Sequence, residues 1–400
     1  MNYLLHTTLI TLVVLVADIA VEIYVPALPS IAAFFSASAE IIKLTMGSNI
    51  LGIAVSSLFY GALSDAWGRK PALILGLSIF VVASLLCIFS TSVFVLIFWR
   101  FFQGVGQGVA MVVGFASVKD FYSGERCAQI ISRLSTVVAV SPAFAPLLGS
   151  MILVHFTWHY IFLFLALIAS ICLLMLIFFF QDTLKHKNPL SLRAIFASYM
   201  RVIRNKNYIL YSFVVVITFM WLWNVITSAP FLLLEDMNVP MTEYGYLVAI
   251  NVSGFVIGTI LNHRYLHYVG LRNFIRFGLT LPLLSEILLI ILHYTTGFSA
   301  LLLECIWFFS AMGLAFVIGN ATTLVLDQVD ERDNGKATAL LVFFEMVFGA
   351  LGVYINAPFY DGTIVPLAIF TIGCVLATML MLLILFRVDR KENTTNQVVR

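Results

Sequence analysis

Charged side chains are scarce in this sequence. Asp, Glu, Lys and Arg make up 10% of the 400 residues, whereas hydrophobic residues make up 62% and the mean hydropathy is +1.04. Soluble domains have about 25% charged residues, so this composition excludes a soluble globular protein. It is typical of an all-α membrane protein with several spanning helices.

Cysteine patterns are also lacking. The five cysteines are scattered, with no C-x-x-C pair, no zinc-ligand spacing and no plausible disulfide framework. No nucleophile–base or metal constellation of an enzyme is evident either. The sequence therefore predicts no cofactor, no bound metal and no enzymatic activity.

Apolar runs of about 20 residues, separated by short polar turns, predict twelve spanning helices. The first run is a retained helix, because it lacks the basic segment and the cleavage site of a signal peptide. The predicted spans are 7–29, 43–64, 72–90, 93–119, 131–153, 158–180, 208–233, 242–262, 273–293, 298–325, 337–358 and 363–386.

The longest polar connection, Gln181–Asn207, divides the spans six from six. We predict an N-terminal six-helix bundle at 1–184, a cytoplasmic linker at 185–207, a C-terminal six-helix bundle at 208–387 and a cytoplasmic tail at 388–400. At a constant offset, Asn49, Gly52, Gly68 and Gly76 fall on Asn251, Gly254, Gly270 and Gly278. This match predicts two parallel repeats.

The basic residues predict the orientation. All of the 22 Lys and Arg except Lys43 and Arg100 lie in alternate loops or in the C-terminal tail. By the positive-inside rule, both termini are cytoplasmic.

Two acidic residues, Asp18 and Glu22, lie within the first span at i, i+4 spacing and so share one helix face. A charge at this depth costs about 2.5–3.5 kcal/mol by insertion scales. That face must therefore look into protein or water, and such acids usually serve the movement of protons, ions or charged solutes. We predict proton coupling by Asp18, Glu22 and Arg100. Arg100 in the fourth span should face one of these acids or a water-filled cavity.

The loop after the second span contains Gly61, Asp65, Gly68, Arg69 and Lys70. This pattern resembles the G-x3-D-x2-G-R-[KR] loop of the major facilitator superfamily. The glycines permit a tight turn and a close helix approach. The resemblance implies the twelve-helix major-facilitator fold and a conformational latch at this loop.

Other segments are similar to the Bcr/CflA branch of drug:proton antiporters. Helix one reads Glu22-Ile-Tyr24-Val-Pro-Ala-Leu-Pro, with Glu in place of the usual Asp, and helix four reads Arg100-Phe-Phe-Gln103-Gly-Val-Gly. Helix five keeps the Ala-Pro-x-x-Gly core of the antiporter motif. Its motif residues are Pro142, Pro146 and Gly149.

We expect a mid-membrane cavity that is apolar with a few polar anchors. Besides the acids of helix one, we predict that residues sharing a helix face, many of them with aromatic or amide side chains, line this cavity. The predicted residues are Tyr24, Gln103, Gln107, Met111, Met220, Trp223, Asn224, Thr227, Asn251, Asn320 and Glu345.

Three further acids lie within predicted spans. Glu304 is near the outer end of its span and is expected to reach water. Glu286 is expected on a peripheral helix. For Glu345, contact with substrate and a place between the halves both remain open.

The resemblance implies a proton-coupled transporter of a bacterial cell inner membrane. The first hypothesis is efflux of small amphipathic drugs or organic cations by antiport and alternating access. The alternative is a carrier of an endogenous metabolite such as a siderophore, working by export or by proton symport. The expected partners are a small-molecule substrate, protons and the lipid bilayer, with no nucleic acid, and the protein is expected to be a monomer.

Overall fold

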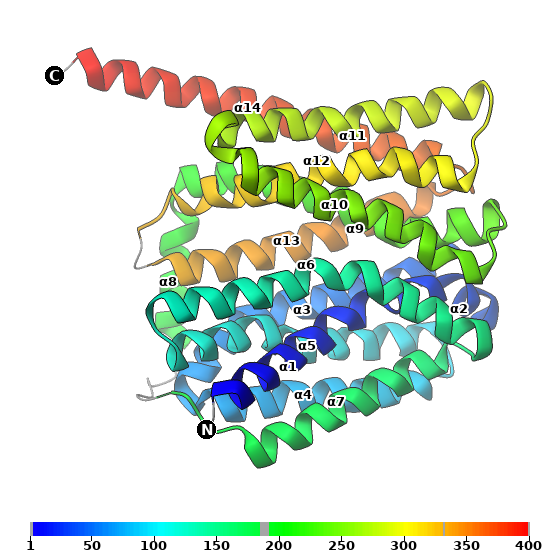
Figure 1. Cartoon of the computed structure of the whole chain (residues 1–400), viewed down its shortest axis with the longest axis horizontal. Coiled ribbons are helices and arrows are strands. Elements are labelled where there is room, and N and C mark those ends of the chain that lie inside the picture. Colours follow the sequence, from blue (N-terminus) through cyan, green and yellow to red (C-terminus); the bar gives the residue numbers. More distant parts are fainter. Residues whose placement is uncertain (1–2, 185–191, 331–332, 399–400) are drawn as a thin grey trace.

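The computed structural model describes residues 3–184, 192–330 and 333–398, and these residues form helices and short connections without any strand (Figure 1). The N-terminal helices are α1 (Tyr3–Glu22), α2 (Leu28–Phe35), α3 (Ala39–Trp67), α4 (Arg69–Ile88), α5 (Val93–Phe121), α6 (Gly124–His155) and α7 (His159–Phe179). They are followed by α8 (Leu192–Ile203), α9 (Lys206–Pro230), α10 (Met241–Val269), α11 (Leu271–Tyr294), α12 (Ala300–Leu326), α13 (Asn334–Asn356) and α14 (Val365–Val398).

Spanning helices account for most of the described chain. Eleven are long and apolar enough to cross a membrane, and α6, which bends by 43° between Pro142 and Phe144, is the twelfth. The first span runs through α1, a short 3-10 turn and α2. The twelve predicted spans are therefore confirmed. The sequence did not predict the amphipathic helix α8, which lies within the predicted linker 185–207; residues 185–191 of that linker lie outside the described residues.

The two halves repeat the same helix packing. In α3, a Cβ added to Gly52 would come within 2.1 Å of the carbonyl oxygen of Phe101, and in α10 one added to Gly254 would come equally close to the carbonyl oxygen of Phe308. Only glycine allows backbones to approach this closely. The repeat that the sequence predicted is thus visible in the contact of α3 with α5 and of α10 with α12.

The two ends of the bundle differ. Both termini and α8 lie at one end, here called the linker end (Figure 1, left), and the opposite end is called the far end. At the far end the halves meet directly, with Gly245 of α10 against Leu147 of α6. At the linker end, Tyr199 of α8 donates a hydrogen bond to the carbonyl oxygen of Leu58 in α3.

Candidate functional site

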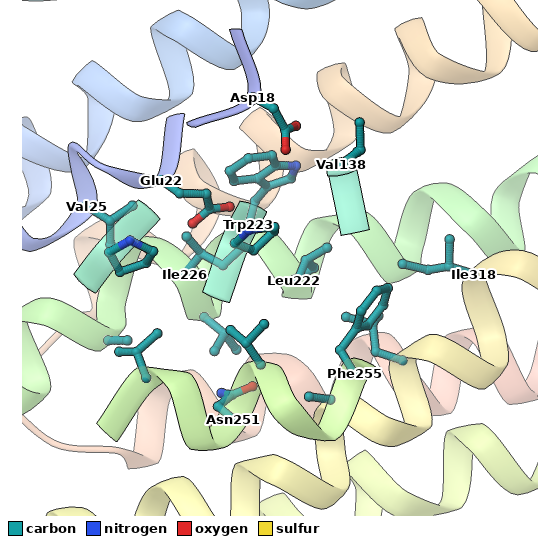
Figure 2. A pocket seen from close by; sticks show the side chains of 18 of the residues that line it. Asp18, Glu22, Val25, Val138, Leu222, Trp223, Ile226, Asn251, Phe255 and Ile318 are labelled. Carbon is teal, nitrogen blue, oxygen red and sulfur yellow. The ribbon is translucent and has the colours of Figure 1, made fainter. Parts of the chain in front are cut away.

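A cavity of 460 Å³ lies between the halves and is lined by residues of α1, α5, α6, α9, α10 and α12. This volume suits a drug-sized molecule. Most of the lining is apolar. Figure 2 shows Asp18 and Glu22 on one side and Asn251 on the opposite side, with Leu222, Trp223 and Ile226 among the apolar side chains of the wall.

Acidic residues dominate the charge of the cavity. Asp18, Glu22 and Glu304 all line it, and its described lining includes no Lys, Arg or His. Asp18 accepts a hydrogen bond from the hydroxyl of Ser141 on α6, and its carboxylate interacts electrostatically with that of Glu22. The acidic face of helix one therefore looks into the cavity rather than into lipid.

Arg100 does not meet these acids, so the expectation that it would face them or a water-filled cavity is wrong. Its guanidinium donates to Oε1 of Gln103 and lies 4.2 Å from the centre of the Tyr24 ring. The side chain is fully buried, and within the described chain it has no salt-bridge partner and is not part of the cavity lining. Arg100 is held by an amide and by aromatic faces, which attract cations.

Glu304 is the functional candidate that the sequence analysis misjudged. It was expected to reach water, but only 1% of it is exposed, and it lines the cavity from the C-terminal half. Neither of its carboxylate oxygens has a hydrogen-bond partner at bonding distance among the described residues, although the Asn251 amide lies beside it. Its place within two turns of the start of α12 indicated how deep Glu304 lies in the membrane, but it did not indicate the direction in which the side chain points.

The cavity is accessible from the linker end. Lining residues nearer the far end, such as Val25, Tyr244 and Glu304, are buried. Lining residues nearer the linker end are open to solvent, and 41% of Met111 is exposed. Since contact between the halves closes the far end, a solute would enter and leave this conformation through the linker end.

Of the other predicted cavity residues, Met111, Trp223 and Asn251 line the cavity. The remaining ones are not part of its lining in this conformation. They are Tyr24, Gln103, Gln107, Met220, Asn224, Thr227, Asn320 and Glu345.

Internal hydrogen bonds explain several of these exclusions. Gln107 accepts from Asn49 at 2.6 Å and donates to the carbonyl oxygen of Ala17 at 2.8 Å. In the other half, Asn224 accepts from Asn356. These amides join helices to one another, which is a structural role that helix spacing alone does not distinguish from substrate binding.

The other excluded residues are also occupied within the helical bundle. Asn320 donates to Asn262, and the hydroxyl of Thr227 donates to a carbonyl of its own helix. Met220 packs among partly buried apolar residues. Glu345 is buried on α13, which packs against α3 of the other half. Glu345 itself interacts electrostatically with Tyr208 of α9, within the same half.

The predicted latch loop forms a compact network at the linker end. Arg69 donates to Asp65 at 2.5 Å and to Asp120 of α5 at 2.6 Å, and its backbone N–H donates to Asp182 at 2.9 Å. Gly68 has φ +116°, a conformation that favours glycine. The loop therefore connects α3, α5 and the segment after α7.

Two other residues of the loop complete its connections. Lys70 donates to the carbonyl oxygen of Ile177 at 2.8 Å. Gly61 lies near Val112 of α5, at ordinary contact distance. The acidic partners Asp120 and Asp182 come from distant parts of the sequence, so the motif alone did not reveal them.

The antiporter motif lies on the bent helix α6. Pro142 and Pro146 line the cavity. A Cβ on Gly149 would come within 2.3 Å of the carbonyl oxygen of Ile23, so α6 packs tightly on the first span where α1 ends. The motif thus links the cavity wall to the segment that follows Glu22.

A cluster at the far end joins the halves. The ammonium group of Lys43 from α3 lies 3.9 Å from the centre of the Tyr360 ring and 5.6 Å from that of Phe231. The hydroxyl of Tyr360 donates to Asp236. Burial and the Asp236 carboxylate raise the pKa of Tyr360, which keeps the hydroxyl protonated as the donor. We call these four residues the far-end cluster.

The fold and the cavity define a multi-pass membrane transporter. The family model of the Major Facilitator Superfamily matches residues 10–353, and this chain belongs to that superfamily. It is 27% identical over 370 residues to the bicyclomycin resistance protein homolog of Haemophilus influenzae, with 90% of each chain covered. It is also 27% identical to the multidrug resistance protein MdtL of Citrobacter koseri, over 92% of this chain and 93% of that one.

Solved structures share the fold. A D-xylose-proton symporter has a TM-score of 0.73 at 14% identity, covering 95% of this chain and 97% of its own. The human organic anion transporter MFSD10 has a TM-score of 0.69 at 17% identity, covering 96% and 100%. These comparisons confirm the major-facilitator fold and the resemblance to the Bcr branch.

Proposed function

We propose that this protein exports small amphipathic drugs, chiefly organic cations, across a bacterial inner membrane in exchange for protons. The observation that carries the proposal is the cavity, whose mostly apolar wall holds three carboxyl groups and, among the described residues, no basic side chain. An apolar wall suits amphipathic molecules, and a buried carboxylate requires a cation or a proton to offset its charge. The names of the bicyclomycin-resistance and multidrug-resistance relatives support drugs as the substrate.

Exchange follows if cation and proton compete for Asp18 and Glu22. A bound organic cation stabilises the charged carboxylates, and protons replace it after its departure. Because an empty, doubly charged site is costly at this depth, the cavity reorients with one kind of ligand or the other. Each proton that moves inward contributes about 2.3 kcal/mol per 100 mV of membrane potential.

Alternating access requires that the two ends of the cavity open in turn. We place the linker end, with both termini, in the cytoplasm, so the present conformation accepts substrate from inside the cell. Export then requires the far-end cluster to separate and the linker end to close. In this proposal the Arg69 loop is the latch of the linker end, and the protein works as a monomer in the bilayer.

The test uses purified protein in liposomes with an acidic interior and an enclosed pH dye. Organic cations from several drug classes are added outside in turn, together with siderophores. The proposal expects cation-dependent proton loss from the vesicles, and none when Asp18→Asn and Glu22→Gln are combined. A response to siderophores alone would replace drug efflux by metabolite transport, and silence towards all cations would overturn the proposal.

A further inference from the structure

Glu304 places a second acidic position in the cavity, separate from the two acids of helix one. It belongs to α12 of the C-terminal half, whereas Asp18 and Glu22 belong to α1 of the N-terminal half. The Asp18 and Glu22 carboxylates interact with each other, whereas Glu304 lies beside the Asn251 amide of its own half. Tyr244 also lines the cavity and interacts electrostatically with both Glu22 and Glu304.

Among the described residues no salt bridge offsets the charge of the Glu304 carboxylate, and the neutral amide of Asn251 is the polar group beside it. The residue is 1% exposed, and both oxygens lack a hydrogen-bond partner at bonding distance within the described chain. A buried carboxylate without a cationic partner is costly, and either a proton or a bound cation relieves that cost. Because Glu304 lines the cavity, a ligand bound there can supply the missing positive charge.

We propose that Glu304 forms a second cation subsite, so that the cavity preferentially accepts dications whose two charged groups are joined by an apolar spacer. This inference rests on the proposed function, since one charged group occupies the Asp18 and Glu22 position. The other meets Glu304 and the Asn251 amide, and the spacer lies along the apolar wall that Trp223 and Ile226 provide (Figure 2).

A monocation does not need Glu304, because the acids of helix one already offset its charge. A dication that met only those acids would leave its second charge in an apolar environment, which is unfavourable. Loss of the Glu304 charge should therefore weaken the binding of dications selectively.

The probes are two fluorescent compounds with the same ring, an N-alkyl quinolinium ion and a bis-quinolinium ion whose rings are joined by a polymethylene chain. Their dissociation constants are measured on the purified full-length protein in detergent. Glu304→Gln should raise the dissociation constant of the dication about tenfold or more and change that of the monocation by less than about twofold.

Glu286→Gln is the matched control. Glu286 on α11 is also buried with both oxygens unpartnered among the described residues, but it is not part of the cavity lining. Its variant should bind both probes as the wild type does. Glu304→Asp keeps the charge and should retain the preference for the dication. This variant replaces Glu304→Gln in the test if Glu304→Gln does not fold.

The outcomes separate this inference from the proposed function. Equal weakening of both probes by Glu304→Gln, no weakening of either, or the same selective loss in Glu286→Gln would each overturn the second subsite while leaving cation export standing. If Glu304→Gln does not fold, loss of the dication preference in a folded Glu304→Asp protein would overturn it. A wild-type protein that binds neither probe would overturn the proposed function, and the subsite with it.

Discussion

The two halves of the molecule share a scaffold but differ in buried chemistry. Gly52 and Gly254 bring equivalent helices together with the same closeness. Asn49 and Asn251, which precede these glycines, are also equivalent positions of the repeat. Asn49 donates a hydrogen bond to Gln107 in the N-terminal half, whereas Asn251 lies beside Glu304 at the cavity. At this pair of equivalent positions, the asparagine of the N-terminal half is bonded within the helical packing, whereas that of the C-terminal half lines the cavity. The repeat therefore supplies the architecture, and departures from the repeat supply the site.

The same contrast exists within the N-terminal half. Arg100 is enclosed by Gln103 and the Tyr24 ring, while Asp18 and Glu22 face the cavity. The buried position of Arg100 favours a role in helical packing, and the place of the two acids supports the proposal that they carry the exchange chemistry. Substitutions can test both contrasts.

The largest effect is expected for Arg100→Ala. Truncation of this fully buried side chain leaves a cavity and removes the partner of Gln103, so stability should fall by about 2–5 kcal/mol. The measurement is thermal unfolding of the purified variant in detergent. The pH dependence of any remaining transport should match that of the wild type. A shifted pH profile would show that Arg100 takes part in proton coupling.

Asp18→Asn should reduce proton-coupled transport about a hundredfold, equivalent to about 2.7 kcal/mol, without loss of folding. The amide keeps the shape and the contact with Ser141 but cannot exchange a proton. Substrate-driven proton movement in liposomes measures the effect. Glu345→Gln, also a change of a buried acid but one outside the cavity lining, should retain most of the activity. Full coupling in Asp18→Asn would show that Asp18 is not needed.

Gly52→Ala and Gly254→Ala should destabilise the protein by similar amounts, about 1–3 kcal/mol each. In both cases the new methyl group meets a backbone carbonyl that cannot rotate away. Gly319→Ala on α12 is the control, since nothing lies within 4 Å of its added Cβ. Markedly unequal melting temperatures for the first two variants would argue against an equivalent scaffold in the two halves.

The smallest effect is expected at the far-end cluster. Tyr360→Phe removes the hydrogen bond by which Asp236 of the same half positions the Tyr360 ring against Lys43 of the other half. This bond is worth about 0.5–1.5 kcal/mol, and its loss should shift the population towards an open far end several-fold. Spin labels at Glu40 and Thr363, in a variant without native cysteines, would report the distance across this end. Tyr294→Phe, at an exposed tyrosine, should leave the distances unchanged. An unaltered distribution in Tyr360→Phe would mean that this hydrogen bond does not hold the end closed.

The sequence predicted the helices well because each span must bury its own backbone polar groups in an apolar run. It also predicted that Asp18 and Glu22 share a face, since their spacing is local. It failed at Arg100 and Glu304, where the outcome depends on which neighbouring helix the side chain meets. The sequence shows how deep a residue lies in its span. Tertiary structure decides which side chains it meets, such as Tyr24 for Arg100 and Asn251 for Glu304.

The domain division at residues 184 and 207 and the cytoplasmic placement of the termini stay predictions. The N-terminal residues of the linker and the end of the tail lie outside the described residues. The basic residues of the alternate loops and of the tail determine the predicted orientation, which labelling of engineered cysteines from either side of intact cells would test.

The central claim is that an organic cation and protons compete for the acids of helix one. Its most direct test adds the quinolinium monocation to purified protein in a weakly buffered detergent solution and records proton release with a pH indicator. The account predicts release on binding by the wild type and none by a protein that combines Asp18→Asn with Glu22→Gln. Binding by the wild type without any release of protons would contradict it.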